Sequence, residues 1–378
     1  MSIETVFVQR HEVGGGPLTF AVKDCIDIAG QSTRQGSAIF ADAAPAPTDA
    51  RVVANLLASG DWRLIGKLGM HELAFGVTGI NPWEGTPVNP LWPDRIVGGS
   101  SSGSAAAVAA GMVDMALGTD TGGSVRLPAA CCGVIGFKPG YGVLSREGVH
   151  PVQSSLDSVG LLTRGMDVMI RAMKALAPPA AVEDGNGRLL RLAVSGVEPD
   201  VQAAFEAALD AIGSPIADGV IQSFDAAFDA SLIIMGAENW AALGAHADHP
   251  GMGEDVRARL KAGARHGGDA VAAANAVRAQ LIDEIDDLLR GVDSIVLPTL
   301  PCVPPTLDRA ADARALVPLT RLVRPFNLSG HPAITLPIRT AERLPAGLQL
   351  VGRRGGDAAL LSLAARVARR LGLEEKQA

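Results

Sequence analysis

Two short segments rich in glycine and serine, expected to be turns, constrain most strongly how this chain can fold. The first turn, residues 98–104, reads GGSSSGS, and the second, residues 118–124, reads GTDTGGS. Between them lie an alanine-rich run at 105–110, typical of a small-faced helix, and an alternating apolar run at 113–117, typical of a strand. A helix and a strand joined in this order bring two such turns face to face. We therefore expect the two turns to lie face to face.

Strands and helices alternate through the first half of the chain, which favours an α/β fold. The short run 95–97 is one of the expected strands. From 166 to 291 the pattern changes to mostly helix, with a candidate hinge at 178–186 and no catalytic motif. Strand patterns then return and are followed by an amphipathic helix: 294–297, 333–338, 347–351 and 357–371. We expect the late strands to rejoin the first sheet, so that residues 1–378 form one large domain.

Charge and cysteine usage narrow the class of protein. A formal net charge of −7 gives no electrostatic footprint for nucleic acid. The four cysteines form no C-x-x-C pair, which favours free thiols in a reducing cytoplasm over a zinc site or a disulfide framework. The N-terminal segment lacks the apolar core of a signal peptide, and no uncharged apolar window is long enough to span a membrane. We expect a cytoplasmic protein without a metal that binds neither nucleic acid nor membrane.

The second turn has the composition of an oxyanion-binding loop. Gly122 and Gly123 free successive backbone N–H groups from side-chain bulk just before the hydroxyl of Ser124. Donors that converge where negative charge develops stabilise a tetrahedral intermediate, each by a few kcal/mol. A nucleophilic serine also needs a base.

The identity of that base stays open on residue chemistry alone. No histidine lies close to the two turns in the sequence. Lys67 follows the apolar run Leu64–Gly66, and burial of a lysine lowers its pKa far enough for the amine to accept a proton near neutral pH. A lone lysine after a strand is more often a surface charge.

Several segments resemble the amidase signature family. The resemblance is strongest at 98–111, 117–130 and 132–139, which carry both turns and the run after them. Shorter segments match in family order, namely AVKD at 21–24, GKLGMHELA at 66–74, SLDSVG at 155–160, LPT at 297–299, FNLSGHPA at 326–333 and GLQLVG at 347–352. The matches cover about the first 165 residues strongly and about the last 85 moderately.

The resemblance implies a fold and a domain plan. The fold is a single large α/β domain with a twisted mixed sheet covered on both faces by helices. The signature core spans about 60–165, a variable helical region spans 166–291, and C-terminal strands and a helix span 292–378.

The resemblance also implies a Ser–cisSer–Lys triad that hydrolyses linear amides through an acyl-enzyme, without a cofactor. In this numbering Ser124 is the nucleophile, Ser100 the bridging serine after a cis bond from Gly99, and Lys67 the base. The substrate is a small-molecule amide, and a homodimer is an open possibility. Further residues take smaller parts: the N–H groups of Thr121, Gly122, Gly123 and Ser124 form the oxyanion hole, and Ser101, Asp120 and Arg126 support the loop.

Other functions remain as alternatives. The signature equally suits the glutamine-hydrolysing subunit of a tRNA-dependent amidotransferase, which is active only with its partners, and a carbamate or ester hydrolase of the same fold. Residues 99–103 also satisfy G-x-S-x-G, which would make Ser101 the nucleophile of an α/β-hydrolase with His331 as its base. That motif alone is weak, because five residues match it easily by chance.

Overall fold

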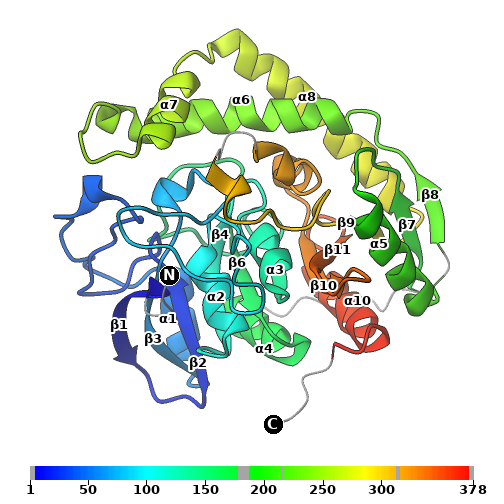
Figure 1. The fold of residues 1–378 in the computed structure, drawn as a ribbon, viewed down its shortest axis with the longest axis horizontal. Helices are drawn as coiled ribbons and strands as arrows, with labels where there is room; N and C mark the ends of the chain where they lie inside the picture. Colours follow the sequence, from blue (N-terminus) through cyan, green and yellow to red (C-terminus); the bar gives the residue numbers. More distant parts are fainter. Residues whose placement is uncertain (1–4, 178–186, 215, 312–315, 374–378) are drawn as a thin grey trace.

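The computed structural model describes residues 5–177, 187–214, 216–311 and 316–373, and it places their strands in one mixed sheet (Figure 1). The predicted hinge at 178–186 lies outside the described residues. The eleven strands follow the order β1 (Phe7–Val13), β3 (Trp62–Leu68), β2 (Leu18–Lys23), β4 (Met115–Asp120), β6 (Ser158–Thr163), β5 (Ile135–Lys138), β10 (Ala333–Arg339), β11 (Pro345–Val351), β9 (Ser294–Pro298), β7 (Leu189–Leu192) and β8 (Ile216–Gly219).

The late strands rejoin the first sheet, as predicted. β10 pairs antiparallel with β5, with Ala333 opposite Lys138, and β11 and β9 continue outward from it. At the other end, β2 runs parallel to both β3 and β4. The sheet is therefore continuous between the first and last thirds of the chain, and the prediction of a single α/β domain is confirmed.

Helices cover both faces of the sheet. Successive strand residues point to opposite faces, so Met115 and Leu117 join the core on one face while Ala116 joins the core on the other. The first face packs on α1 (Arg51–Ala58), α4 (Met166–Leu176), α5 (Pro199–Ile212) and α10 (Asp357–Arg370). The second face packs on α2 (Ser102–Ala109), α3 (Arg126–Cys132), α6 (Phe224–Leu243) and α8 (Gly268–Leu289). This arrangement confirms the predicted layers.

The alanine-rich helix α2 lies close to the sheet because its side chains are small. Its residues from Ser102 to Val108 are all buried. A Cβ atom at Gly103 would lie 2.5 Å from the carbonyl oxygen of Gly69 in the segment that follows β3. Glycine at this position therefore allows the backbone of α2 to pack directly on its neighbour.

The remaining elements include two departures from the prediction. Residues 95–97 form only an isolated bridge, Arg95 with Thr306, because the segment pairs with a loop. The region predicted as mostly helix contains β7 and β8, two strands of four residues each, and β8 is largely exposed at the sheet edge. Strands this short give no alternating pattern in the sequence.

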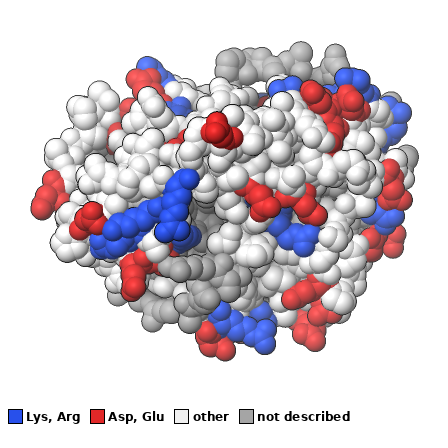
Figure 2. Space-filling view, turned by 90° about the horizontal axis from the view of Figure 1, so that it is seen from above, with Lys and Arg blue, Asp and Glu red and all other residues white. Residues whose placement is uncertain are grey.

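Helices α6, α7 (Glu254–Gly263) and α8 lie along the top of the view in Figure 1. Viewed from that side, acidic and basic side chains are interspersed over the surface, with one basic run near the centre (Figure 2). Among the described helices, none has the length and the apolar character that a membrane crossing requires.

Candidate active site

The two glycine-serine turns contact each other at the ends of neighbouring elements. The first turn leads into α2, and the second connects the end of β4 to the start of α3. The backbone N–H of Ser101 donates to the carbonyl oxygen of Ser124, at 3.2 Å. The prediction that the turns meet face to face is confirmed.

The two predicted triad serines differ in exposure. Ser100 is fully buried, and its peptide bond from Gly99 is cis, as the family resemblance implied. Ser124 is half-buried, which leaves its hydroxyl within reach of a solute. A nucleophile must meet its substrate, so this difference suits Ser124 to attack and Ser100 to relay a proton.

The lysine that contacts Ser100 is Lys23. It ends β2, the strand directly beside β4, and its Nζ donates to Ser100 Oγ at 2.7 Å and to Thr119 Oγ1 at 2.7 Å. Its side chain is fully buried. Burial lowers the pKa of the Lys23 amine from its usual value, although the nearby acidic groups of Cys25, Asp157 and Asp120 oppose that shift. Lys23 therefore has the position and the weakened basicity that a neutral proton acceptor needs.

The predicted base, Lys67, lies elsewhere, and its assignment is wrong. Its Nζ donates to Ser32 O at 3.0 Å and to Thr33 Oγ1 at 2.6 Å, and it pairs with Asp24 Oδ1 at 3.2 Å. The reason is strand order. Lys67 belongs to β3, which β2 separates from β4. Its contacts are those of a buried structural ion pair.

Sequence reasoning missed Lys23 although a signal was present. Lys23 also ends an apolar strand, and it is part of the AVKD segment that matches the family. An acidic residue, Asp24, directly follows Lys23 in the sequence. In the folded protein Asp24 instead pairs with Lys67 on the neighbouring strand.

The second turn, residues 118–124, offers three backbone N–H groups without an acceptor in the described structure, rather than the predicted four. The N–H of Gly123 donates to Asp120 Oδ1 at 2.7 Å, so it already has an acceptor. Within the described residues, the N–H groups of Thr121, Gly122 and Ser124 have no hydrogen-bond acceptor. These three remain available to an anionic oxygen.

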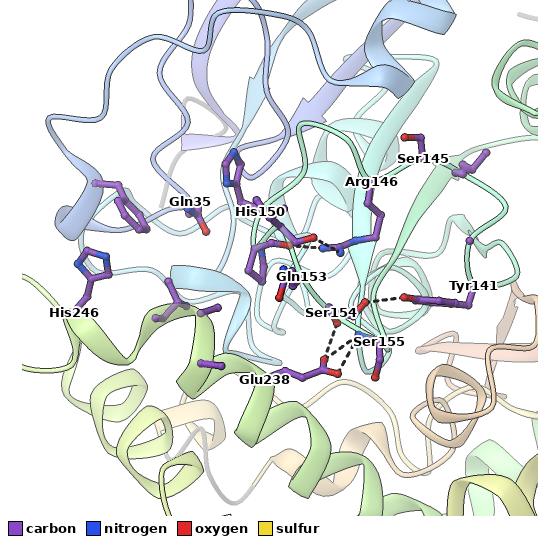
Figure 3. Close-up of a pocket in the computed structure, with 18 residues that line it drawn as sticks. Gln35, Tyr141, Ser145, Arg146, His150, Gln153, Ser154, Ser155, Glu238 and His246 are labelled. Atoms are coloured by element: carbon purple, nitrogen blue, oxygen red, sulfur yellow. Dashed lines mark hydrogen bonds between the residues drawn. The ribbon is translucent and has the colours of Figure 1, made fainter. Parts of the chain in front are cut away.

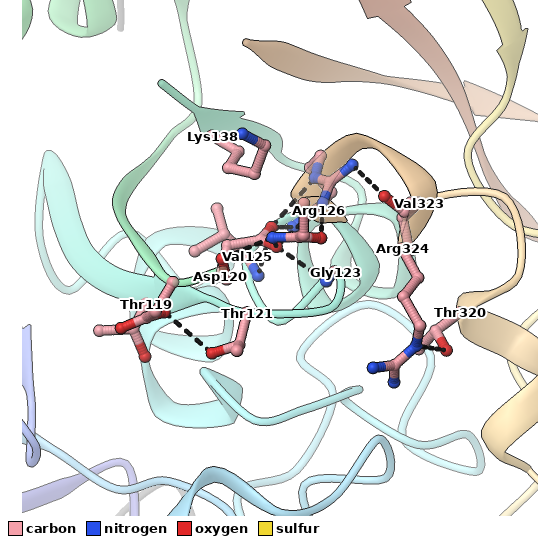
Figure 4. A network of polar contacts seen from close by, with 12 residues as sticks. Thr119, Asp120, Thr121, Gly123, Val125, Arg126, Lys138, Thr320, Val323 and Arg324 are labelled. Atoms are coloured by element: carbon pink, nitrogen blue, oxygen red, sulfur yellow. Dashed lines mark hydrogen bonds and ion pairs between the residues drawn. The ribbon is translucent and has the colours of Figure 1, made fainter. Parts of the chain in front are cut away.

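Asp120 and Arg126 lie in the protein interior and hold this turn in place (Figure 4). Both side chains are fully buried, and Arg126 Nη2 lies 2.9 Å from Asp120 Oδ1. Burial alone would raise the pKa of Asp120, but the charge and hydrogen bonds of Arg126, with help from Asn327, hold it well below its usual range. Arg126 also donates to Val323 O at 2.9 Å and to Gln349 Oε1 at 2.8 Å. The predicted supporting role of this pair matches these contacts.

We expect Arg126→Met to lower the free energy of unfolding by about 3–5 kcal/mol, because it leaves the Asp120 carboxylate buried without its cation. Urea denaturation measures this loss. The double variant Arg126→Met/Asp120→Asn is the control, and it should recover part of the stability because it removes the uncompensated charge. Equal stability of Arg126→Met and the wild type would show that the ion pair does not brace the turn.

The residues of the alternative α/β-hydrolase site do not meet. Ser101 Oγ donates to Thr119 O at 3.3 Å. His331 instead contacts Ser329 Oγ and Asp286 Oδ1, each at 3.0 Å. In the described structure Ser101 therefore has no histidine base, and its hydrogen bonds to Thr119 and Ser124 of the second turn fit a supporting role.

A cavity of about 960 Å³ lies between the segment 141–155 and α6 (Figure 3). It is lined by the segment from Tyr141 to Ser155 and by α6, whose Glu238 accepts from Ser154 and Ser155. Neither triad serine lines it. One lining residue, Arg146, pairs with Asp157 at 2.9 Å, and Asp157 accepts from Thr121 Oγ1 of the second turn at 2.9 Å.

The described residues contain no group of three or more histidine, cysteine, aspartate or glutamate side chains that could hold a metal ion. All four cysteines are free thiols: Cys25, Cys131, Cys132 and Cys302.

Fold and site together define an α/β protein with a helix-covered mixed sheet. Two serine turns meet a buried lysine where the neighbouring strands β2 and β4 end. The family model described as Amidase matches residues 16–189 and 187–361, and the chain belongs to this family.

The chain is similar in sequence to proteins with different names, and in fold to a solved amidase structure. The chain is 34% identical to one of the subunits of the glutamyl-tRNA(Gln) amidotransferase of Halobacterium salinarum, over 93% of this chain and 96% of the relative. It is 33% identical to Amidase 1 of Oryza sativa subsp. japonica, over 92% of this chain and 88% of the relative. A crystal structure of an amidase superposes with a TM-score of 0.86 at 33% identity, covering 94% of this chain and 85% of the other.

Proposed function

We propose that this protein hydrolyses amide bonds, with Ser124 as the nucleophile, Ser100 as the bridging serine and Lys23 as the base. The observation that carries the proposal is the 2.7 Å contact between Lys23 Nζ and Ser100 Oγ, in a turn that also contacts Ser124. Burial of Lys23, which lowers its pKa, supports the neutral amine that a base requires.

The proposed reaction proceeds in two halves. Neutral Lys23 takes the proton of Ser100 Oγ while Ser100 takes the proton of Ser124 Oγ, and Ser124 Oγ attacks the amide carbon. The same relay then returns a proton to the amide nitrogen, the C–N bond breaks, and ammonia or an amine leaves. Water attacks the acyl ester on Ser124 by the same route and releases the carboxylic acid.

The proposed oxyanion hole consists of the N–H groups of Thr121, Gly122 and Ser124. Each lacks an acceptor in the described structure, and together they belong to the turn that carries the nucleophile. Donors that are already oriented stabilise the tetrahedral oxyanion without reorganisation. The Asp120 carboxylate accepts from the N–H of Gly123 and from Arg126, and these hydrogen bonds keep the donors of the turn in position.

A second candidate is the glutamine-hydrolysing component of an amidotransferase, which the similarity to the Halobacterium amidotransferase subunit favours. Carbamates and esters are further substrates that the same acyl-enzyme chemistry accommodates. The free thiols suit a reducing compartment, so we place the protein in the cytoplasm.

We expect the purified chain alone to release ammonia from small aliphatic or aryl amides. The measurement is ammonia release across a panel of aliphatic amides, aryl amides, carbamates and glutamine, with the Ser124→Ala variant as the blank. Hydrolysis of simple amides without any partner supports an independent amidase. Activity only on glutamine, and only after addition of a partner protein, would contradict it and favour the second candidate.

A further inference from the structure

The guanidinium group of Arg324 lies directly against the second turn, residues 118–124, which carries the proposed nucleophile and is called the nucleophile turn from here on. It precedes the short helix α9 (Pro325–Leu328), and its side chain fills the space that Gly122 leaves open. A Cβ atom at Gly122 would lie 2.6 Å from Arg324 Nη1. Gly122 is two residues before Ser124, and two residues span at most ~7.6 Å between their Cα atoms. The guanidinium is therefore within the length of a small substrate from the proposed nucleophile.

This guanidinium has no acidic partner in the described part of the chain. Its Nε donates to Thr320 Oγ1 at 3.1 Å, its Nη1 contacts Met235 Sδ at 3.3 Å, and it lies 5.8 Å from the ring centre of Phe228. Nη2 has no hydrogen-bond partner among the described residues. A buried cation without a counter-ion is unfavourable, so such a group is expected to have a ligand.

Burial and charge at this position both favour an incoming anion. Arg324 is only 5% exposed. Burial lowers its pKa to about 10; the negative charge of Asp120 opposes this shift, and the positive charges of Arg259 and Arg126 add to it. A bound carboxylate would offset the cost of keeping this guanidinium charged.

Arg126 provides the contrast within the same region. Its guanidinium is saturated by Asp120, Asn327, Gln349 and the carbonyl of Val323. Figure 4 shows the guanidinium of Arg324 pointing away from that network, toward Thr320. Arg126 is therefore a structural arginine, whereas Arg324 keeps donors available.

We propose that Arg324 binds the carboxylate of an amide substrate, so that the protein acts on monoamides of dicarboxylic acids. This inference rests on the proposed amide hydrolysis. A guanidinium fork binds a carboxylate through two parallel hydrogen bonds, which fixes the orientation of the substrate as well as its affinity. The groups that contact Arg324, namely Thr320, Met235 and Phe228, include no acid that could bind an ammonium group. An anionic amide therefore fits better than zwitterionic glutamine.

The test compares matched substrates: glutaramate, its uncharged analogue pentanamide, and glutamine. We expect the wild-type kcat/KM for glutaramate to exceed that for pentanamide by roughly 10- to 100-fold, as for other charge-assisted hydrogen bonds. Arg324→Met should lose this preference, mainly through a higher KM for glutaramate. An equal preference in wild type and Arg324→Met, or no preference in the wild type, would overturn the inference.

Two further variants distinguish loss of carboxylate binding from a general loss of structure. Arg321→Met is the matched control, because Arg321 lies on the same segment but donates to the backbone of Ser195, and it should keep the full preference. Arg324→Lys keeps the charge and loses the fork, so it should retain part of the preference even if Arg324→Met does not fold. A preference fully retained in Arg324→Lys would contradict bidentate binding.

A binding measurement separates this inference from the proposed function. In the Ser124→Ala background, glutarate should raise the melting temperature, and Arg324→Met should abolish that rise. Arg324-dependent binding of glutarate without hydrolysis of any amide would leave the anion site standing and overturn the proposed function. Hydrolysis of neutral amides with no glutarate binding would leave the function standing and overturn the anion site.

Discussion

Lys23→Met is expected to abolish amide hydrolysis, whereas Lys67→Met keeps the catalytic machinery. Of these two lysines, Lys23 is the one whose amine contacts Ser100 Oγ, so its loss removes the proton acceptor and should lower kcat/KM by about 10⁴-fold or more. Lys67 contacts Asp24, Ser32 and Thr33 on the far side of β2. The measurement is kcat/KM for both variants on the best amide of the panel.

Activity is expected to fall most in Lys23→Met, whereas the free energy of unfolding is expected to fall most in Lys67→Met. Lys67→Met leaves Asp24 buried without its cation, which is expected to lower the free energy of unfolding by about 3–5 kcal/mol. The double variant Lys67→Met/Asp24→Asn removes the unpaired charge and is the control for activity in a folded protein. An inactive, folded double variant together with an active Lys23→Met would return the role of base to Lys67.

Ser124→Ala and Ser100→Ala are each expected to lower kcat/KM by about 10⁴-fold or more, because the members of a relay act as a unit. Neither change adds volume or charge, so the fold should persist. Ammonia release measures the loss.

Ser102→Ala is the matched control in the same serine run. Its hydroxyl is buried without a hydrogen-bond partner in the described structure, and its removal should leave activity unchanged and stability equal or slightly higher. Activity of Ser124→Ala comparable with that of Ser102→Ala would rule out Ser124 as the nucleophile.

Local sequence pattern predicted the α/β fold and the meeting of the two turns because both depend on contiguous segments. The helix and the strand between the turns fix their relative position within about 25 residues. The late strands were predictable because their apolar runs are typical of strands buried on both faces, and such strands lie inside a large sheet. Strands as short as β7 and β8 carry too little pattern to be recognised.

The errors concern choices that only strand order and side-chain direction decide. Lys23 and Lys67 both end apolar strands, and nothing local to either shows which strand adjoins β4. The carboxylate of Asp120 takes the N–H of Gly123, a contact that a run of backbone donors in the sequence does not reveal. Arg324 was not predictable because its surroundings come from α6 and from the nucleophile turn, both distant in the sequence.

The most direct measurement of the central claim is covalent labelling of Ser124 by a serine-directed phosphonofluoridate, mapped by peptide mass spectrometry. Labelling reports nucleophile activation without any assumption about the natural substrate. The account predicts rapid labelling of Ser124 in the wild type and in Lys67→Met/Asp24→Asn, and labelling slowed by about 10³-fold or more in Lys23→Met. Rapid labelling of Ser124 in folded Lys23→Met, or labelling of a different serine in the wild type, would contradict it.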